Sequence, residues 1–101
     1  MMKQHFGALI RSIRMRRKEP LRVIAAAVGI DSTLLSKLER GERLPTEMQI
    51  SNFAQVFQLS ETELKGIVIA EKMMTIYDDA DAVAYAAQVI KEQAETYMGE
   101  Q

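Results

Sequence analysis

Cationic side chains dominate the first half of this 101-residue sequence, and binding of an anionic partner is the chemistry that they most directly suggest. Residues 1–45 contain ten Lys or Arg and four Asp or Glu, for a net charge of +6. Residues 46–101 contain three Lys or Arg and ten Asp or Glu, for a net charge of −7. Cations can neutralise the phosphates of a nucleic acid, whereas carboxylates are repelled by them. The charge pattern therefore predicts that the first half faces a polyanion and that the second half faces away from it.

Other reactive or ligand-binding groups are scarce. The sequence has no cysteine, which excludes disulfides, thiolate metal sites and cysteine nucleophiles, and its one histidine, His5, is expected on the surface. Asp78, Asp79 and Asp81 form an acidic cluster, but it lacks the glycine and the distal glutamate of a calcium loop. We expect this cluster to begin a helix. Because no nucleophile–base pair and no phosphate-binding glycine loop occurs, we expect no catalysis, no metal and no cofactor.

Apolar residues recur at helical spacing and strand-like alternation is absent, which predicts an all-α fold. The six expected helices lie at about residues 6–17, 20–28, 32–40, 46–57, 60–77 and 79–98. Their apolar faces should form the core, and they comprise Phe6, Leu9, Ile10, Ile13, Leu21, Ile24, Ala25, Val28, Leu35, Leu38, Ile50, Phe53, Ala54, Phe57, Leu64, Ile67, Ala70, Met74 and Tyr77.

The expected helix ends carry recognisable signals. Pro20 suits the first turn of a helix, and Gly29 and Gly41 suit the left-handed position that follows a last turn. Capping boxes are expected at residues 46–49 and 60–63. Gly66 could bend or split the fifth helix.

The second and third expected helices are joined by the short turn Gly29-Ile30-Asp31. Two short helices around a three-residue turn that contains glycine are the outline of a helix-turn-helix. Small side chains at residues 25–27, all alanine, should let the two helices approach closely. Ile30, Leu35 and Leu38 should fix their crossing angle. Such a crossing allows the second helix to lie in the major groove of DNA.

Residues 6 to about 67 resemble the Cro/C1-type helix-turn-helix family, also called the XRE or lambda-repressor-like family. The resemblance rests on the stretches IAAAVGID at 24–31 and LSKLERGERLPT at 35–46. The second stretch contains the family's exit from the third helix, a hydrophobic residue followed by Glu39, Gly41 and Pro45. The resemblance implies a five-helix DNA-binding domain, which we expect over residues 1–67. We expect residues 68–101, which lie beyond the resemblance, to form a helical dimerisation or interaction extension.

The resemblance also implies that the helix at about 32–40 is the recognition helix. The residues expected at base edges or phosphates are Ser32, Thr33, Ser36 and Lys37. The residues placed to hold phosphates are Arg22, Arg40 and Arg43. Leu21 stands where many members have a polar residue, and Leu34 occupies an often polar position, where it either contacts a thymine methyl or joins the core.

Arg14 and Glu39 match a family pair that forms a partly buried salt bridge between the first and third helices. Such a pair explains why a carboxylate lies among phosphate-binding cations, which it would otherwise oppose. The first helix ends in a cationic run, and we expect some of its members to face DNA. The run comprises Arg11, Arg14, Arg16, Arg17 and Lys18.

The last expected helix carries an apolar stripe at spacings of four, three, four and three residues. Its members are Val83, Ala87, Ile90, Ala94 and Tyr97. This is a short a/d seam of barely over two heptads. We expect it to pack both on the fifth helix and against a second copy of the chain, which makes these residues the predicted dimerisation site.

These features predict a sequence-specific DNA-binding transcriptional regulator, a repressor or autoregulator that binds operator DNA as a homodimer. A cytoplasmic location without membrane association is expected, because no apolar run could span a bilayer and residues 1–5 lack a signal peptide's apolar stretch. One alternative is an antitoxin-type regulator or adaptor whose acidic C-terminal helices bind a toxin or another protein. A controller of a restriction–modification operon, or a protein-interaction module, is a further alternative.

Overall fold

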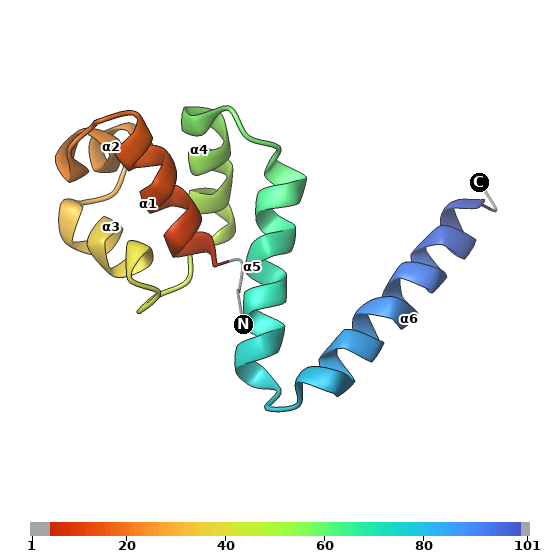
Figure 1. Cartoon of the computed structure of the whole chain (residues 1–101). Coiled ribbons are helices and arrows are strands. Elements are labelled where there is room, and N and C mark those ends of the chain that lie inside the picture. Colours follow the sequence, from red (N-terminus) through yellow and green to blue (C-terminus); the bar gives the residue numbers. More distant parts are fainter. Residues whose placement is uncertain (1–4, 100–101) are drawn as a thin grey trace. The chain divides into compact units, whose positions relative to one another are not determined.

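The structure, a computed structural model, describes residues 5–99, with side chains up to residue 96. All regular structure in this range is helical, so the predicted all-α fold is confirmed. The helices are α1 (Phe6–Arg16), α2 (Leu21–Val28), α3 (Ser32–Glu39), α4 (Glu47–Phe57), α5 (Glu61–Ile76) and α6 (Ala80–Gly99) (Figure 1). The chain divides into two compact units between Glu71 and Lys72, so α5 begins in the first unit and ends in the second.

The starts of α4 and α5 follow the local signals in the sequence. The Thr46 hydroxyl accepts the Gln49 N–H at 3.2 Å, and the Gln49 side-chain oxygen accepts the Thr46 N–H at 3.0 Å, which completes the expected capping box. At the start of α5, the Ser60 hydroxyl accepts the Glu63 N–H at 3.1 Å. From there α5 runs through Gly66 without a break. The helix is therefore not split at the glycine.

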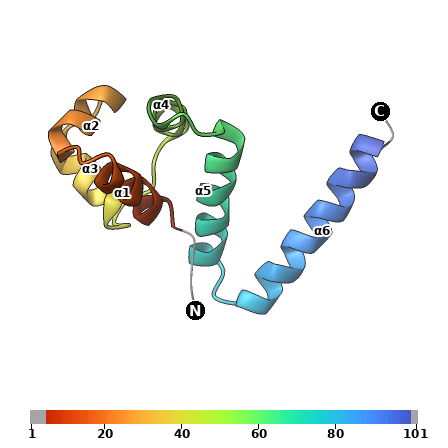
Figure 2. The same cartoon turned by 45° about the horizontal axis from the view of Figure 1, so that its top comes forward.

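The hydrophobic core of the first unit lies among α1 to α4 and the first part of α5, whose arrangement is seen from two directions in Figures 1 and 2. Phe6 and Phe53 meet edge to face, with ring centroids 5.3 Å apart. The buried side chains are Phe6, Ile10, Ile13, Ile24, Ala25, Val28, Leu35, Leu38, Ile50, Phe53, Ala54, Phe57, Leu64 and Val68. Burial of one large apolar side chain contributes about 1.5–3 kcal/mol, so packing rather than helix propensity stabilises these short helices.

A close helix contact in this unit is made by a residue other than those that the sequence predicts. Ala25 is buried, but Ala26 and Ala27 are exposed, so the expectation that all three lie where α2 and α3 approach closely is wrong. Close contact is made instead by Gly7 of α1, where an added Cβ would lie 2.1 Å from the carbonyl oxygen of Leu38. Only glycine fits where the α1 backbone meets the end of α3.

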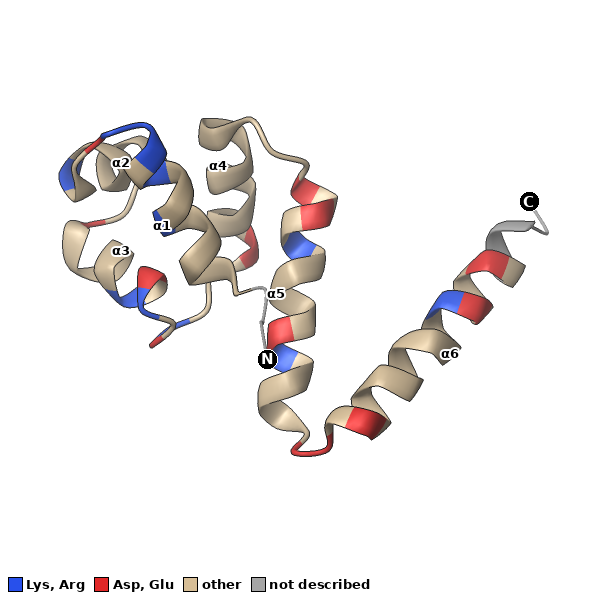
Figure 3. Ribbon diagram, viewed as in Figure 1, with Lys and Arg blue, Asp and Glu red and all other residues tan. Residues whose placement is uncertain are grey.

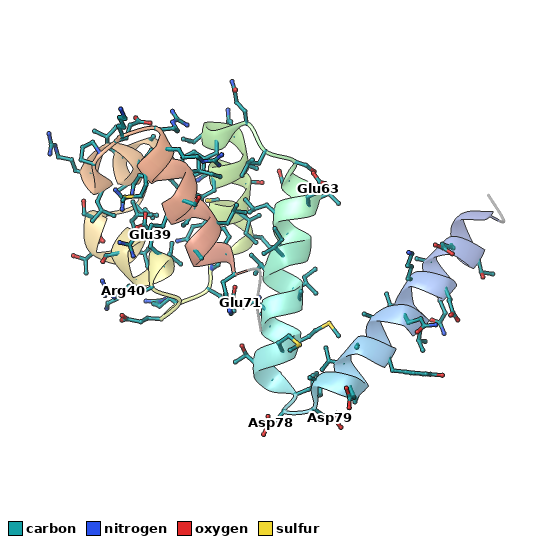
Figure 4. All side chains as sticks on the ribbon, viewed as in Figure 1. Glu39, Arg40, Glu63, Glu71, Asp78 and Asp79 are labelled. Atoms are coloured by element: carbon teal, nitrogen blue, oxygen red, sulfur yellow. The ribbon has the colours of Figure 1, made fainter. Side chains whose placement is uncertain are left out.

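The second unit contains the last part of α5 and all of α6. As expected for an acidic cluster at a helix start, the Asp79 carboxylate accepts the Ala82 N–H at 3.0 Å and caps α6. Asp78 and Asp79 lie in the turn between the two helices (Figure 4). Beside this turn is a groove of about 590 Å³ whose apolar lining consists of Met73, Ile76, Tyr77, Ala82, Val83 and Ala86.

The predicted apolar stripe of α6 is largely open in the single chain. Val83 is 8% exposed, whereas Ile90 is 56% exposed and Ala87 and Ala94 are also exposed. The side chain of Tyr97, the last member, lies outside the described residues. The expectation that the whole stripe packs on α5 is therefore not met by the described members. Within residues 5–99, no helix combines the length and hydrophobicity needed to cross a membrane.

Two residues predicted on the apolar face of the fifth helix are exposed. Ala70 lies on the solvent side of α5, and Tyr77 follows the end of the helix with 59% of its surface exposed. Met74 is half-buried, as is Ile67, which packs against the edge of the core. The predicted stripe thus holds fully only at Leu64 and fails at Ala70 and Tyr77. Val68, which the prediction omits, is the other residue of α5 that is buried in the core of the first unit.

Candidate nucleic-acid interface

The turn between α2 and α3 depends on a glycine in the left-handed conformation. Gly29 has a φ of +86°, which side chains with a Cβ rarely adopt. Its N–H donates to the Ala26 carbonyl at 3.2 Å, and the Ile30 N–H donates to the Ala25 carbonyl at 2.9 Å. This pair of bonds is a Schellman motif, which ends α2 and turns the chain sharply. The short turn therefore places α3 directly after α2, as a helix-turn-helix requires.

A local cap and two core leucines fix the orientation of α3. The Asp31 carboxylate accepts the Leu34 N–H at 2.7 Å and so satisfies one free donor of the first turn. Leu35 and Leu38 are 0% and 1% exposed and anchor one face of the helix in the core. Leu34, for which the sequence allows a core position or a thymine contact, is half-buried and packs against the core. The opposite face of α3 is left open to solvent.

That open face carries the four residues expected to read DNA. Thr33 is exposed, and Ser32, Ser36 and Lys37 are half-buried. Hydroxyl and ammonium groups of this kind can form hydrogen bonds with base edges or phosphates. The structure thus places all four on one short helix, whose backbone is held by a cap at the start and by core contacts along its length.

Arg40, expected to hold a phosphate, already has partners within the chain. Its Nε donates to the Glu42 carboxylate, and its Nη1 donates to the Ser36 hydroxyl. The hydrogen bond with Glu42 raises the pKa of Arg40, and the same bond lowers the pKa of Glu42, so both groups remain charged. Arg43 is exposed. Sequence reasoning missed Glu42, although an acid two residues after Arg40 in a cationic stretch was a visible signal.

Arg14 and Glu39 form the salt bridge that the family resemblance implied. Arg14 donates through Nε to Glu39 Oε2 at 2.7 Å and through Nη2 to Glu39 Oε1 at 2.9 Å. Its Nη1 donates to the Glu19 carbonyl at 3.1 Å. The side chains of Arg14 and Glu39 are only 12% and 6% exposed, and the hydrogen bond with Glu39 raises the pKa of Arg14. This pair joins α1 to the end of α3, where Glu39 is labelled in Figure 4.

The cationic run at the end of α1 divides into structural and free residues. Arg17 donates to the Val56 carbonyl at 3.2 Å, lies 5.4 Å above the Phe57 ring centroid and pairs with Glu19 at 2.6 Å. It therefore ties α1 to α4, as Arg14 ties α1 to α3. Arg11, Arg16 and Lys18 are exposed, as is Arg22 of α2, and they are the cations that we expect to be available to DNA.

Figure 3 shows how the basic and acidic residues are distributed along the chain. Lys and Arg colour the end of α1, the start of α2 and the end of α3, whereas in α5, the turn after it and α6 the red segments of Asp and Glu outnumber the blue ones. Within the first unit, the cations therefore gather on the segments that flank the helix-turn-helix. This is the local concentration of positive charge that a DNA-binding surface needs.

Two further polar contacts support the first unit and were not predicted. The Asn52 side chain donates to the Val28 carbonyl at 3.1 Å and thus connects α4 to the end of α2. The Glu71 carboxylate accepts the Phe6 N–H at 3.0 Å, and its other oxygen lies 3.4 Å from Nδ1 of His5, which is on the surface as expected (Figure 4). Both contacts join residues far apart in sequence, so no local pattern could indicate them.

Comparison with known proteins agrees with this geometry. A family model described as a helix-turn-helix domain matches residues 5–65. A crystal structure of the P22 c2 repressor in complex with a synthetic operator has a TM-score of 0.58 and 26% identity, and the match covers 61% of this chain and 94% of that one. A solution structure of the DNA-binding domain of the same repressor gives the same TM-score and identity and covers 63% of this chain and 84% of that one.

A longer match is to the clp gene regulator ClgR from Corynebacterium glutamicum. It covers 95% of this chain and 92% of that one, with a TM-score of 0.54 and 23% identity, which shows a likeness of fold. No protein with a curated description matches the sequence.

Proposed function

We propose, from the premise that this chain belongs to the helix-turn-helix domain family and is a DNA-binding transcriptional regulator, that it binds operator DNA as a homodimer and represses transcription there. The observation that carries the proposal is the construction of α3. Leu35 and Leu38 hold one face of this helix in the core, and the opposite face offers hydroxyl and ammonium groups between clusters of cations.

In the proposed complex, α3 lies in the major groove. Thr33 and Lys37 contact base edges, with Ser32 and Ser36 beside them, and these contacts select the sequence. Arg22 and Arg43, both exposed, hold phosphates on either side and fix the position of the helix. Arg16 and Lys18 extend this cationic surface along the end of α1.

Repression is supported by the nature of the similar proteins. The P22 c2 repressor, which shares 26% identity with this chain, was solved with a synthetic operator. A protein that occupies an operator blocks other proteins from the same DNA, and this requires no activity beyond binding. We therefore assign repression or autoregulation to this chain rather than catalysis.

Dimerisation is proposed to use residues 79–98. The contact residues would be Val83, Ala87, Ile90, Ala94 and Tyr97. Support comes from the exposed apolar side chains of the second unit, where Ile76, Tyr77, Tyr85 and Ile90 are each more than half exposed. Apolar surface gathered in this way is unusual on a monomer and typical of a protein–protein contact. Two linked domains would also read two half-sites and so multiply specificity.

The DNA-binding proposal is tested by fluorescence anisotropy on genomic fragments over a range of salt concentrations. The logarithm of the affinity should fall against the logarithm of the salt concentration by about 0.9 per phosphate contact. Lys37→Ala and Thr33→Ala should each lose about 1–3 kcal/mol of discrimination, whereas Arg43→Ala should weaken all sequences alike. Binding that does not respond to salt, or three variants that change only general affinity, would contradict the proposed reading face.

The dimer proposal is tested by sedimentation of a double variant, Val83→Asp with Ile90→Asp. It should be monomeric, retain the helix content of the first unit and lose most of its operator affinity. Ala84→Asp with Gln88→Asp is the matched control, because it adds the same two charges at exposed positions on another side of α6. A monomeric wild type, or a stripe variant that stays dimeric, would move the dimer contact elsewhere.

A further inference from the structure

We propose that Glu42 is a specificity-determining residue, whose carboxylate competes with DNA phosphates for Arg40 and so weakens binding to DNA that α3 does not recognise. The proposal rests on the proposed DNA-binding function. It concerns a residue on the reading surface whose charge has the wrong sign for binding DNA, and this is the feature that needs an explanation.

The backbone holds Glu42 beside the recognition helix. Gly41 has a φ of +76°, its N–H donates to the Leu38 carbonyl at 3.1 Å, and the Glu42 N–H donates to the Lys37 carbonyl at 2.9 Å. These bonds form a Schellman motif that folds the chain back toward the last turn of α3. The position of Glu42 is therefore set by the end of the helix and not by a mobile loop.

The side chains then form a surface network. Arg40 donates to the Glu42 carboxylate and to the Ser36 hydroxyl, and the side chains of Arg40 and Glu42 are 53% and 51% exposed. Glu42 is paired with Arg40 and its N–H donates to the Lys37 carbonyl, so the acid lies next to two of the residues expected to contact DNA. A third residue expected to contact DNA is Ser36, whose hydroxyl already accepts a hydrogen bond from the Arg40 guanidinium.

This arrangement gives a choice between two partners for one guanidinium. On DNA that makes no base contacts with α3, Arg40 remains paired with Glu42 and contributes no net charge. On an operator, the base contacts of α3 keep the DNA backbone close to Arg40 for longer, and a phosphate replaces the Glu42 carboxylate as the partner of the guanidinium. An exposed ion pair is weak enough for such an exchange. Glu42 therefore subtracts one phosphate contact from non-specific binding and little from operator binding.

The test compares Glu42→Gln with Glu63→Gln in the full chain by fluorescence anisotropy. Glu63 is exposed on α5, away from α3, so its substitution makes the same change in total charge (Figure 4). The probes are a random-sequence duplex and an operator selected from random DNA by the wild-type protein. Melting temperatures of both variants should match the wild type because both side chains are exposed.

We expect Glu42→Gln to bind the random duplex roughly five- to tenfold more tightly than Glu63→Gln near 0.1 M salt, with a salt slope steeper by about 0.9. Operator affinity should rise less, so the ratio of the two affinities falls. In an Arg40→Ala background, Glu42→Gln should add nothing beyond the charge control. That result would show that Glu42 acts through the guanidinium.

Two results would overturn the inference while leaving the proposed function intact. One is a Glu42→Gln protein that binds the random duplex as Glu63→Gln does. The other is an equal gain on operator and random DNA, which would make Glu42 a general repulsive charge. A wild-type protein that binds neither probe at low salt would instead overturn the proposed function itself, and the inference with it.

Discussion

Replacement of Glu39 by alanine should destabilise the first unit, although the residue lies beside the DNA-reading surface. The substitution removes both charge-assisted hydrogen bonds to Arg14, at 2.7 and 2.9 Å, and leaves a guanidinium that is only 12% exposed. Removal of one partner from a buried pair costs about 3–5 kcal/mol. We expect a loss near the lower end, about 3 kcal/mol, because Arg14 keeps its bond to the Glu19 carbonyl and a little solvent contact.

Thermal unfolding followed by circular dichroism measures this loss. For a domain of this size, each kcal/mol lowers Tm by about 4–8 °C, so Glu39→Ala should melt roughly 12–24 °C below the wild type. Glu63→Gln is the control, because it removes an exposed negative charge on α5 but keeps a side chain that can still cap the helix start, and it should change stability by about 0.5 kcal/mol at most. Hydrogen bonding to Glu39 raises the pKa of Arg14. The stability that this pair contributes is therefore present in full below the ordinary pKa of arginine, and it is lost only when the pH rises through the raised pKa of Arg14.

A second variant shows whether the loss of stability comes from the unpaired charge of Arg14 or from the packing that the Glu39 side chain provided. Arg14→Met combined with Glu39→Leu removes both charges, and most of the stability should return, because apolar residues of similar size commonly replace a buried ion pair without loss. A Glu39→Ala protein that melts within about 2 °C of the wild type would refute the reasoning. So would a double variant that is less stable than Glu39→Ala alone, since it would show that packing and not a stranded charge is responsible.

Three further substitutions test contacts within the first unit. Gly7→Ala should cost about 2–3 kcal/mol in a urea titration, because its Cβ would meet the Leu38 carbonyl oxygen at 2.1 Å, and a neutral result would mean that α1 can move away. Gln58→Gly should raise stability by about 0.5–1 kcal/mol in calorimetry, since residue 58 has a φ of +56° at the end of α4; a decrease would show that its side chain contributes more than the backbone strain costs. Arg17→Ala should lower the free energy of unfolding by about 1 kcal/mol, because the contact of the guanidinium with the Phe57 ring is lost. A change in DNA affinity without a change in Tm would show that Arg17 contacts DNA instead of supporting the fold.

Much of the fold could be read from the sequence because its signals are local. Helical periodicity, the glycines at 29 and 41 and the capping box at Thr46 act over a few residues, so each segment of sequence contains its own evidence. The helix-turn-helix is itself a local motif, in which one short turn sets the relation of two helices. For the same reason, the residues on the open face of α3 could be named without a structure.

The tertiary structure decided which of the many cations are free. Arg17 looks like Arg11 and Arg16 in sequence, yet it donates to a carbonyl 39 residues away. The pairing of Arg14 with Glu39, 25 residues away, was indicated only by the resemblance to a known family. The need for glycine at position 7 likewise comes from a backbone oxygen on another helix. Such contacts depend on where distant segments meet, and no pattern within one segment can encode them. The sequence alone determined that a basic surface exists, and packing determined that only part of it is available to DNA.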